Sequence, residues 1–299
     1  MVIPTKDRWD LLSRHALRSA LAQEDVDLEV VVVDDGSTDG TPERLEGVGD
    51  SRIRVVRHGE SRGQAAARNS GIAEARADWL AFLDDDDVWA PRKLRAQLDA
   101  ARSGSAVFVY GPIVVLDATG AVQETIPAPA PETVRALLET RNALRAGSST
   151  ILARTDVVRE LGGFDVQLSE LTDWDLWLRL AQAGPAAMSD EILAGYFTHP
   201  QNRRVVDDSD VAAEYEYFVR KHPEARAGRA HFSRWVAMGH LRAGQRLRAA
   251  GVYLGSSIRD RDPGNAVRAA AALLGERAFR IRRRLVADTP DLAWLDLYR

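Results

Sequence analysis

The feature that most constrains the fold is a nearly continuous run of β-branched residues over 28–33, which stops abruptly at Asp34-Asp35-Gly36-Ser37. A strand that is apolar on both faces is typical of a parallel sheet covered by helices. Two further apolar segments, 53–57 and 79–83, are separated from it by segments with helical periodicity. This alternation predicts an α/β fold with a doubly wound, mostly parallel central sheet flanked by helices over residues 1–102.

The helices of this part of the chain are predicted from apolar spacing and from Pro or Thr at their starts, over residues 7–23, 41 onward, 64–76 and 91–102. After residue 102 the alternation loosens. Apolar segments over 106–110 and 113–116 predict that the sheet becomes mixed, and the spacing of Leu176, Trp177 and Leu180 predicts a helix that begins near Thr172.

The C-terminal third shows only helical periodicity from about Val211 onward. Breaks are predicted at Pro and Gly residues, near Pro223, Gly228, Gly251 and 262–264. We therefore predict an α/β domain over residues 1–204, with halves 1–102 and 103–204, followed by a helical region over 205–299.

Composition narrows the function classes. The 40 Lys and Arg residues against 44 Asp and Glu give a net charge of −4, which lacks the basic excess of proteins that bind nucleic-acid backbones. The chain has no Cys, so a metal ion would need oxygen or imidazole ligands, which favours Mg²⁺ or Mn²⁺. Its uncharged stretches are too short to span a bilayer and its start has no signal-peptide pattern, so we expect a cytoplasmic protein.

Acidic clusters follow two of the predicted strands: Asp34-Asp35 and Asp84-Asp85-Asp86-Asp87. In open α/β sheets, ligands bind at the carboxyl ends of the strands. Four adjacent carboxylates repel one another unless a cation compensates them, so the second cluster predicts a divalent metal ion. The alternatives are a solvated charge run for the second cluster and an ordinary turn or helix cap for the first.

Several motifs in order resemble those of the GT-A-fold, family 2 glycosyltransferases: Val2-Ile3-Pro4-Thr5, residues 33–41, residues 63–69 and Phe82-Leu83-Asp84-Asp85-Asp86-Asp87. The resemblance runs from Val2 to about Asn202. It implies a GT-A-like fold and the inverting transfer of a hexosyl group from a nucleoside-diphosphate sugar to an acceptor hydroxyl. For this family, cell-envelope polysaccharide or glycolipid assembly is the expected setting, with residues 1–102 binding the nucleotide and 103–204 the acceptor.

The resemblance implies roles for the donor-side residues. Pro4, Thr5 and Asp35 would lie against the base, with Asp35 accepting a hydrogen bond from a ring N–H, as uracil or thymine supplies; a UDP- or dTDP-sugar is therefore expected. Arg68 would lie near the donor, although an arginine on a helix is as often part of a structural ion pair. Asp84 would contact ribose or a metal-bound water.

Two metal contacts are also implied. Asp86 would ligate Mn²⁺ or Mg²⁺, which neutralises the charge that grows on the departing diphosphate. His199 matches a C-terminal histidine that contacts the metal or diphosphate in many GT-A enzymes; a structural role is the alternative. Gly147-Ser148-Ser149 matches a loop beside the donor sugar and acceptor, or is an ordinary turn.

A second signature segment, Gly162-Gly163-Phe164-Asp165 with residues 172–179, implies the catalytic base. Its acidic residue corresponds to Asp173, which would take the proton of the acceptor hydroxyl as the oxygen attacks the anomeric carbon. The alternative is that Asp173 only stabilises the N-terminus of a helix. The family usually has Glu immediately before this Asp, whereas Thr172 stands here.

No catalytic motif is evident over residues 205–299. Helices there would pack on the catalytic domain or on another subunit, giving a homo-oligomer. The arginine-rich segment 277–285 could instead rest on an anionic membrane surface near a lipid-linked acceptor, which would place the protein peripherally at the inner face of the membrane. The expected partners are thus a nucleotide-sugar donor and a glycan or lipid-linked acceptor.

Other enzyme classes fit less well. The Gln-X-X-Arg-Trp motif of processive relatives is absent, because Gln201-Asn202-Arg203-Arg204-Val205 does not match it. A sugar nucleotidyltransferase should have a Gly-rich, Arg-containing loop near its start, yet residues 2–8 contain no Gly. A noncatalytic nucleotide-sugar-binding relative remains open, although degenerate relatives usually lack some of the carboxylates found here. A dehydrogenase is disfavoured because no Gly-X-Gly-X-X-Gly follows the first strand.

Overall fold

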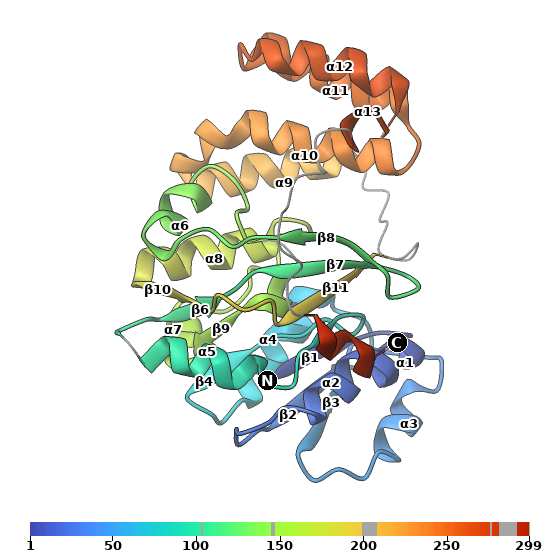
Figure 1. The fold of residues 1–299 in the computed structure, drawn as a ribbon, viewed down its shortest axis with the longest axis vertical. Coiled ribbons are helices and arrows are strands. Elements are labelled where there is room, and N and C mark those ends of the chain that lie inside the picture. Colours follow the sequence, from blue (N-terminus) through green and yellow to red (C-terminus); the bar gives the residue numbers. More distant parts are fainter. Residues whose placement is uncertain (103, 145–146, 199–207, 276, 281–291, 299) are drawn as a thin grey trace. The chain divides into compact units, whose positions relative to one another are not determined.

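The computed structural model describes residues 1–102, 104–144, 147–198, 208–275, 277–280 and 292–298 (Figure 1). The chain forms two compact units. The first comprises Met1–Leu138, Asn142–Thr198 and Asp291–Arg299, and the second Glu139–Arg141 and His199–Pro290. The last described residues, 292–298, therefore belong to the first unit. The sequence-based division instead placed all residues after 204 in the helical region.

The N-terminal part of the first unit is a parallel sheet. Its strands β1 (Val2–Thr5), β2 (Val30–Asp34) and β3 (Ile53–Arg57) pair in that order, and Val2 also bridges in parallel to Phe82, directly after β4 (Trp79–Ala81). Every residue of β2 is buried, as its unbroken β-branched run predicted. The segments that follow β1, β2 and β4 therefore leave the same edge of the sheet.

The helices of this part connect successive strands. The predicted helix over 7–23 is one helical stretch with a π-helical middle, formed by α1 (Trp9–Leu11), η1 (Leu12–Leu17) and α2 (Arg18–Leu21). The next three helices are α3 (Thr41–Glu46), α4 (Gln64–Glu74) and α5 (Lys93–Arg102). Helix α4 lies close against β1: a Cβ added at Gly71 would come 2.3 Å from Val2 Cγ1. This close approach needs a glycine.

The rest of the first unit contains mixed sheets, as predicted. One has the order β10-β6-β9-β4 and another the order β5-β11-β7-β8, with antiparallel pairs in each. The strands are β5 (Val88–Trp89), β6 (Phe108–Tyr110), β7 (Ile113–Asp117), β8 (Val122–Ile126), β9 (Leu152–Arg154), β10 (Ala186–Met188) and β11 (Ala194–Thr198). The helical segments are α6 (Pro131–Leu138), η2 (Gly147–Thr150), α7 (Thr155–Glu160), α8 (Thr172–Ala183) and η5 (Ala293–Leu297).

The second unit is helical, as predicted. It contains α9 (Asp208–Lys221), η4 (Pro223–Gly228), α10 (Arg229–Arg242), α11 (Arg246–Arg259), α12 (Pro263–Leu274) and α13 (Arg277–Arg280). The break predicted near Gly251 is wrong, because α11 runs through it; a single Gly costs a helix only about 1 kcal/mol. The chain turns instead at Gly244, whose φ is +77°. Within the described residues, no helix is both long and apolar enough to cross a bilayer.

Candidate active site

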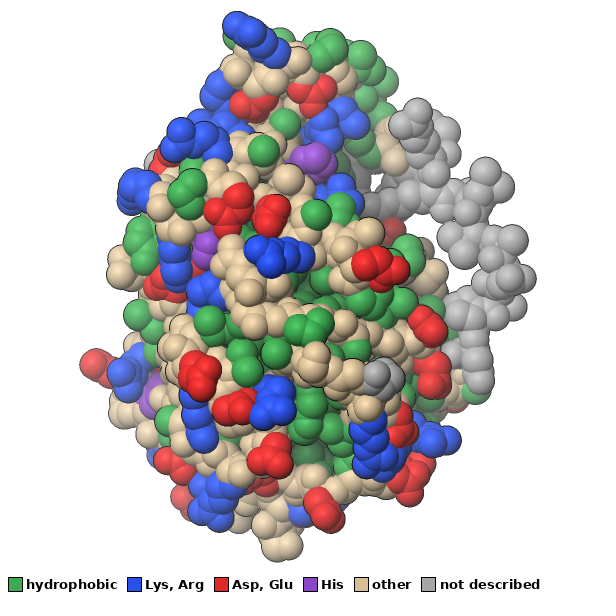
Figure 2. Space-filling model, turned by 90° about the vertical axis from the view of Figure 1, so that its left-hand side faces the viewer, with side chains coloured by type: hydrophobic (Ala, Val, Ile, Leu, Met, Phe, Trp, Pro, Cys, Tyr) green, Lys and Arg blue, Asp and Glu red, His purple; other side chains and the backbone are tan. Residues whose placement is uncertain are grey.

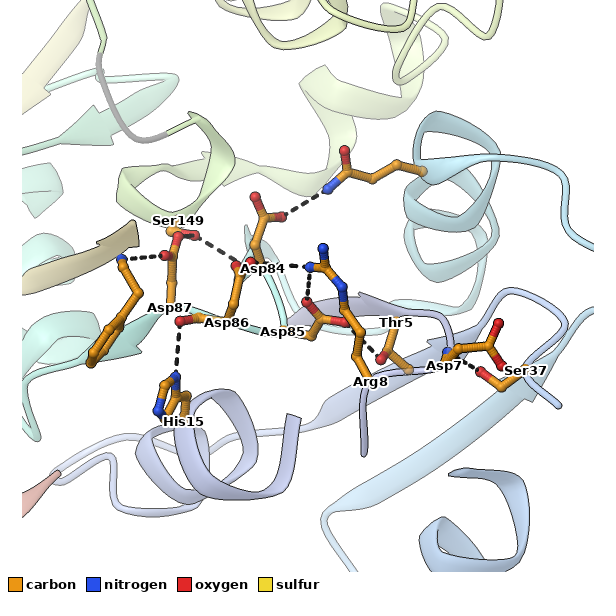
Figure 3. A network of polar contacts seen from close by, with 12 residues as sticks. Thr5, Asp7, Arg8, His15, Ser37, Asp84, Asp85, Asp86, Asp87 and Ser149 are labelled. Atoms are coloured by element: carbon orange, nitrogen blue, oxygen red, sulfur yellow. Dashed lines mark hydrogen bonds and ion pairs between the residues drawn. The ribbon is translucent and has the colours of Figure 1, made fainter. Parts of the chain in front are cut away.

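The acidic segment after β4 directs its side chains to different partners (Figure 3). Thr5 donates a hydrogen bond of 2.8 Å to Asp85 Oδ2. Nη1 of Arg8 lies 3.1 Å from both Asp85 Oδ1 and Asp86 Oδ2, so one guanidinium spans two neighbouring carboxylates. The predicted acidic cluster is therefore partly compensated by an arginine from the end of β1, which the sequence motifs did not identify.

Asp87, the last residue of the segment, is fully buried. Its Oδ2 accepts a hydrogen bond of 2.5 Å from Ser149, and its Oδ1 accepts one of 3.2 Å from the Phe197 N–H. Burial raises the pKa of Asp87 well above its ordinary value, and the charges of Asp86 and Asp84 raise it further. Asp87 therefore joins β4 to β11 and η2, a structural role.

Asp85, the second carboxylate of the cluster, is buried beside the charge of Asp86. Burial, followed by the charge of Asp86, raises the pKa of Asp85 to about 7 even though Arg8 and Thr5 lower it. The divalent ion that the sequence leads us to expect here stays a prediction.

Arg68 on α4 joins the two carboxylates that the sequence assigned to the donor and acceptor sides. Its Nη2 lies 2.6 Å from Asp84 Oδ1, and its Nη1 lies 2.9 Å from Asp173 Oδ1. The arginine is fully buried, with Cζ 5.0 Å from the centre of the Phe164 ring. A donor contact by Arg68 stays a prediction; the observed contacts make it the link between the end of β4 and the start of α8.

Asp173 combines partial exposure with an altered acidity. Its side chain is 18% exposed, whereas that of Arg68 is 0% exposed. Burial raises the pKa of Asp173, the Arg68 guanidinium lowers it, and the charge of Asp84 raises it again, with a net upward shift. A raised pKa makes this carboxylate a stronger base, which suits it to accept a proton.

The Gly147-Ser148-Ser149 segment forms η2 and lies beside Asp84 and Asp173. Ser148 donates a hydrogen bond of 3.3 Å to Asp84 Oδ1, and the Asp84 N–H donates one of 3.2 Å to Ser149 Oγ. A Cβ at Gly147, where φ is +54°, would lie 2.7 Å from Asp173 Oδ2. Only glycine therefore leaves this oxygen of Asp173 uncovered.

Asp35 lies at the end of β2 and organises the loop before α4. Its Oδ1 accepts hydrogen bonds from His58 Nδ1 at 2.7 Å and the Arg62 N–H at 2.8 Å. Its Oδ2 accepts from Ser61 Oγ at 2.7 Å and the Gly63 N–H at 2.9 Å. Burial raises the pKa of this carboxyl, but these hydrogen bonds outweigh burial and the pKa is lowered.

The loop reaches Asp35 because the residue after it is glycine. Gly36 has a φ of +75°, and a Cβ there would lie 2.8 Å from the backbone of residues 60 and 61. The base contact proposed for Asp35 stays a prediction, as does that of Pro4, which is buried in β1. In the structure, the hydroxyl of Thr5 donates its hydrogen bond to Asp85.

We expect Asp35→Asn to lower the free energy of unfolding by about 1–3 kcal/mol, because an amide nitrogen cannot accept the two hydrogen bonds made by one carboxylate oxygen. Thermal and urea unfolding of the ligand-free protein would measure this loss. Asp39→Asn is the control, since one oxygen of Asp39 accepts both hydrogen bonds from Thr41 and an amide oxygen can do the same. Equal stability of the Asp35 variant and the wild type would show that the loop does not depend on this carboxylate.

The remaining predicted positions can be placed only in part. His199 and residues 201–205 lie outside the described residues. Across the part of the chain that is described, no group of three or more His, Asp or Glu side chains is arranged to hold a metal ion by itself. The hydroxyl of Thr172, at the position of the usual Glu, is buried and has no hydrogen-bond partner among the described residues.

The family model described as Glycosyl transferase family 2 matches residues 1–162, more than half of the chain. The chain belongs to this family. It is therefore a glycosyltransferase, as the ordered motifs predicted.

Several curated proteins are similar to the chain. The succinoglycan biosynthesis protein ExoO of Rhizobium meliloti is 42% identical over 105 residues, which are 35% of this chain and 30% of ExoO. Two Escherichia coli UDP-Glc:alpha-D-GlcNAc-diphosphoundecaprenol beta-1,3-glucosyltransferases also match. WfgD is 30% identical over 165 residues, covering 55% of this chain and 62% of WfgD, and WfaP is 28% identical over 181 residues, covering 60% and 69%. The chain thus spans less than two thirds of ExoO and WfgD.

Among solved structures, S. aureus TarS (residues 1–349) in complex with UDP-GlcNAc superposes with a TM-score of 0.60. The two sequences are 17% identical, and the match covers 93% of this chain and 81% of that one. At this identity the likeness concerns the fold alone. The predicted GT-A-like architecture, with mixed sheets flanked by helices and a helical C-terminal region, is confirmed.

Proposed function

We propose that this glycosyltransferase transfers a hexosyl group from a UDP- or dTDP-sugar, with inversion, to a hydroxyl of a lipid-linked or glycan acceptor in cell-envelope assembly. The observation that carries the proposal is the bridge made by Arg68 between Asp84 and Asp173. It joins a carboxylate expected on the donor side to one expected on the acceptor side. The two halves of a transfer reaction would therefore meet at one point.

In this proposal Asp173 is the general base. The acceptor hydroxyl gives its proton to Asp173 as its oxygen bonds to the anomeric carbon. The bond from that carbon to the diphosphate oxygen breaks with its electron pair, and the nucleoside diphosphate leaves. Because the oxygen attacks from the face opposite the leaving group, a single displacement inverts the anomeric centre.

The donor and acceptor classes are supported by the relatives. WfaP and WfgD are named for transfer from UDP-Glc to a GlcNAc-diphospholipid with a β-1,3 linkage, and TarS was solved with UDP-GlcNAc. A β product from an α-linked nucleotide sugar requires inversion at the anomeric carbon. For this chain, these names support a UDP-sugar and a lipid-linked saccharide as the first pair to test.

The residues at the end of β4 fit a divalent ion of the Mn²⁺ or Mg²⁺ type. Mg²⁺ is commonly held by one or two carboxylates together with substrate phosphates, so a three-residue protein cage is not required. Asp86 would hold the ion and Asp84 would contact ribose or a metal-bound water, while Arg8 contacts Asp85 and Asp86. When bound, the ion would neutralise the charge of the departing diphosphate.

We expect Asp86→Ala to remove the dependence of turnover on Mn²⁺ and to leave only slow, metal-independent turnover. Transfer rates across a Mn²⁺ titration would test this. Asp50→Ala, which removes a partly exposed carboxylate paired with Arg52, is the matched control and should keep the wild-type dependence. The assignment of Asp86 fails if its variant shows an unchanged Mn²⁺ response.

Calorimetric binding of UDP, dTDP, GDP and CDP, each with and without Mn²⁺, tests the donor class. Metal-dependent preference for UDP or dTDP is the expected result, and the same ligand should raise the unfolding temperature. Binding without transfer to any lipid-linked acceptor would favour a noncatalytic nucleotide-sugar-binding relative. Release of pyrophosphate from a nucleoside triphosphate and a sugar phosphate would favour a nucleotidyltransferase.

A further inference from the structure

The charge of the chain is strongly segregated. Residues 229–287 contain 13 arginines and only three acidic residues, a net charge of +10, in a chain whose total is −4. The remainder therefore carries −14. A segment of this charge lies in the helical unit, whereas the acidic site described above lies in the other unit.

The acidic residues of this segment that the structure describes are paired inside the helical unit. Asp262 pairs with Arg234 and caps α12 by accepting from the Gly264 N–H. Asp260 accepts hydrogen bonds from Ser256 and from Arg259. By contrast, four arginines on or beside α10 and α11 are exposed in addition to the Arg259 that pairs with Asp260: Arg242, Arg246, Arg248 and Arg261. The outward charge of these helices is therefore positive.

Helix α11 also has an exposed apolar stripe. Leu247, Leu254 and Ile258 are 81%, 52% and 74% exposed. Their spacings of seven and four residues place them on one side of the helix. The opposite side carries Ala249 and Tyr253, which form the small core of the unit.

Helix α12 repeats this pattern. Val267 and Leu274, seven residues apart, are 71% and 75% exposed, and Leu273 is 50% exposed, whereas Ala269 and Ala272 face the core. No acidic residue occurs in α10, α11 or α12. Figure 2 shows hydrophobic side chains gathered at the upper end of the view, where these helices lie, beside Lys and Arg side chains. Exposed apolar patches rimmed by charge mark interaction sites.

We propose that the arginine-flanked apolar stripes of α11 and α12 bind the surface of an anionic phospholipid bilayer. Apolar side chains on a helix that is positively charged and lacks acidic residues are the combination that lies in a membrane interface. Anionic lipid headgroups attract such arginines. The apolar side chains of these helices would insert into the bilayer, and the arginines would attract its headgroups.

Two other occupants fit this surface less well. A second copy placed symmetrically on the same stripes would bring two positively charged surfaces together, which like-charge repulsion opposes. A nucleic acid would satisfy the arginines, but its phosphate backbone would leave the leucine and isoleucine side chains without apolar contacts. Of these three occupants, the lipid surface alone matches both properties.

The test is co-sedimentation of the whole chain with vesicles of phosphatidylcholine alone or mixed with phosphatidylglycerol. We expect binding only to the mixed vesicles, weakening as salt is raised. Arg246→Glu and Arg248→Glu should each weaken binding at least about fivefold, the loss expected for removing one basic residue from such a surface. Leu254→Gln with Ile258→Gln should weaken it as well.

Val166→Gln and Arg92→Glu are matched controls, because both residues are exposed and lie in the other unit. They should bind vesicles as the wild type does. The proposal is overturned by equal binding to both kinds of vesicle, or by no binding. It is also overturned if the α11 substitutions abolish a concentration-dependent dimer without changing vesicle binding. Because the readout is lipid binding, these results are independent of which sugar or acceptor the active site uses.

Discussion

Asp173→Asn should lower kcat for sugar transfer by about 10²- to 10⁴-fold, the usual contribution of a positioned general base. The amide has the same shape as the carboxylate, and its oxygen can still accept the hydrogen bond from Arg68 Nη1. The geometry at the start of α8 should therefore persist, whereas the capacity to take a proton is lost. Transfer rates, together with calorimetric binding of UDP, would separate the two properties: only the rate should fall.

A neighbouring substitution tests the alternative that Asp173 acts only through the charge at the N-terminus of α8. Asp175 lies in the same first turn and pairs with Arg179. Asp175→Asn removes the same charge from the helix terminus and should lower stability while leaving kcat within a few-fold of wild type. Near-normal turnover of Asp173→Asn, or an equal loss of kcat in Asp175→Asn, would rule out Asp173 as the base.

The sequence predicted those features of the site that depend on local pattern. The end of β2 at Asp34 and the position of Asp84–Asp87 after β4 follow from apolar runs interrupted by carboxylates, because strand burial and strand ends are properties of contiguous residues. The start of α8 at Thr172 is likewise set by spacing along one segment. These elements also place the candidate residues at one edge of the sheet.

The partners of these carboxylates could not be predicted, because each comes from a distant segment. Arg8 lies 77 residues before Asp85 and Ser149 lies 62 residues after Asp87. Arg8 belongs to no motif, and the motif that contains Ser149 fitted an ordinary turn as well. The resemblance gave roles to Asp84 and Asp86 but did not identify their partners, whereas the structure gives Asp87 a buried structural role and brings Asp84 to Arg68.

The exposed arginines of α10 and α11 illustrate a different limit. Whole-chain composition shows a net charge of −4, because the acidic remainder conceals the +10 of residues 229–287. Helical spacing alone does not tell which side of α11 is covered. Leu247 and Tyr253 are both large and partly or wholly apolar, yet only Tyr253 is buried. Tertiary packing decides the difference.

Arg68→Met should lower the free energy of unfolding by about 3–5 kcal/mol near neutral pH, the usual result of removing one partner of a buried ion pair. The loss should depend on pH. Without the guanidinium, the pKa of Asp173 in the folded protein rises further above that in the unfolded chain. The penalty is absent where this carboxyl is protonated in both the folded wild type and the folded variant, below about pH 4, and grows as the pH rises through the folded-state values.

Urea unfolding of the wild type and the variant from about pH 4, near the ordinary Asp value, to about pH 8 would measure this difference. Arg159→Met is the matched control, because Arg159 donates to the backbone carbonyls of Ile72 and Ala75 and, among the described residues, to no carboxylate, so its loss should not change with pH. For Arg68→Met, the pH at which kcat/KM falls on the acidic side should also rise by about 1–3 pH units, because the guanidinium lowers the pKa of Asp173. A loss of stability that does not change with pH, together with an unshifted pH profile of kcat/KM, would show that Arg68 does not keep Asp173 ionised. Arg68 would then link the two halves of the site by packing alone.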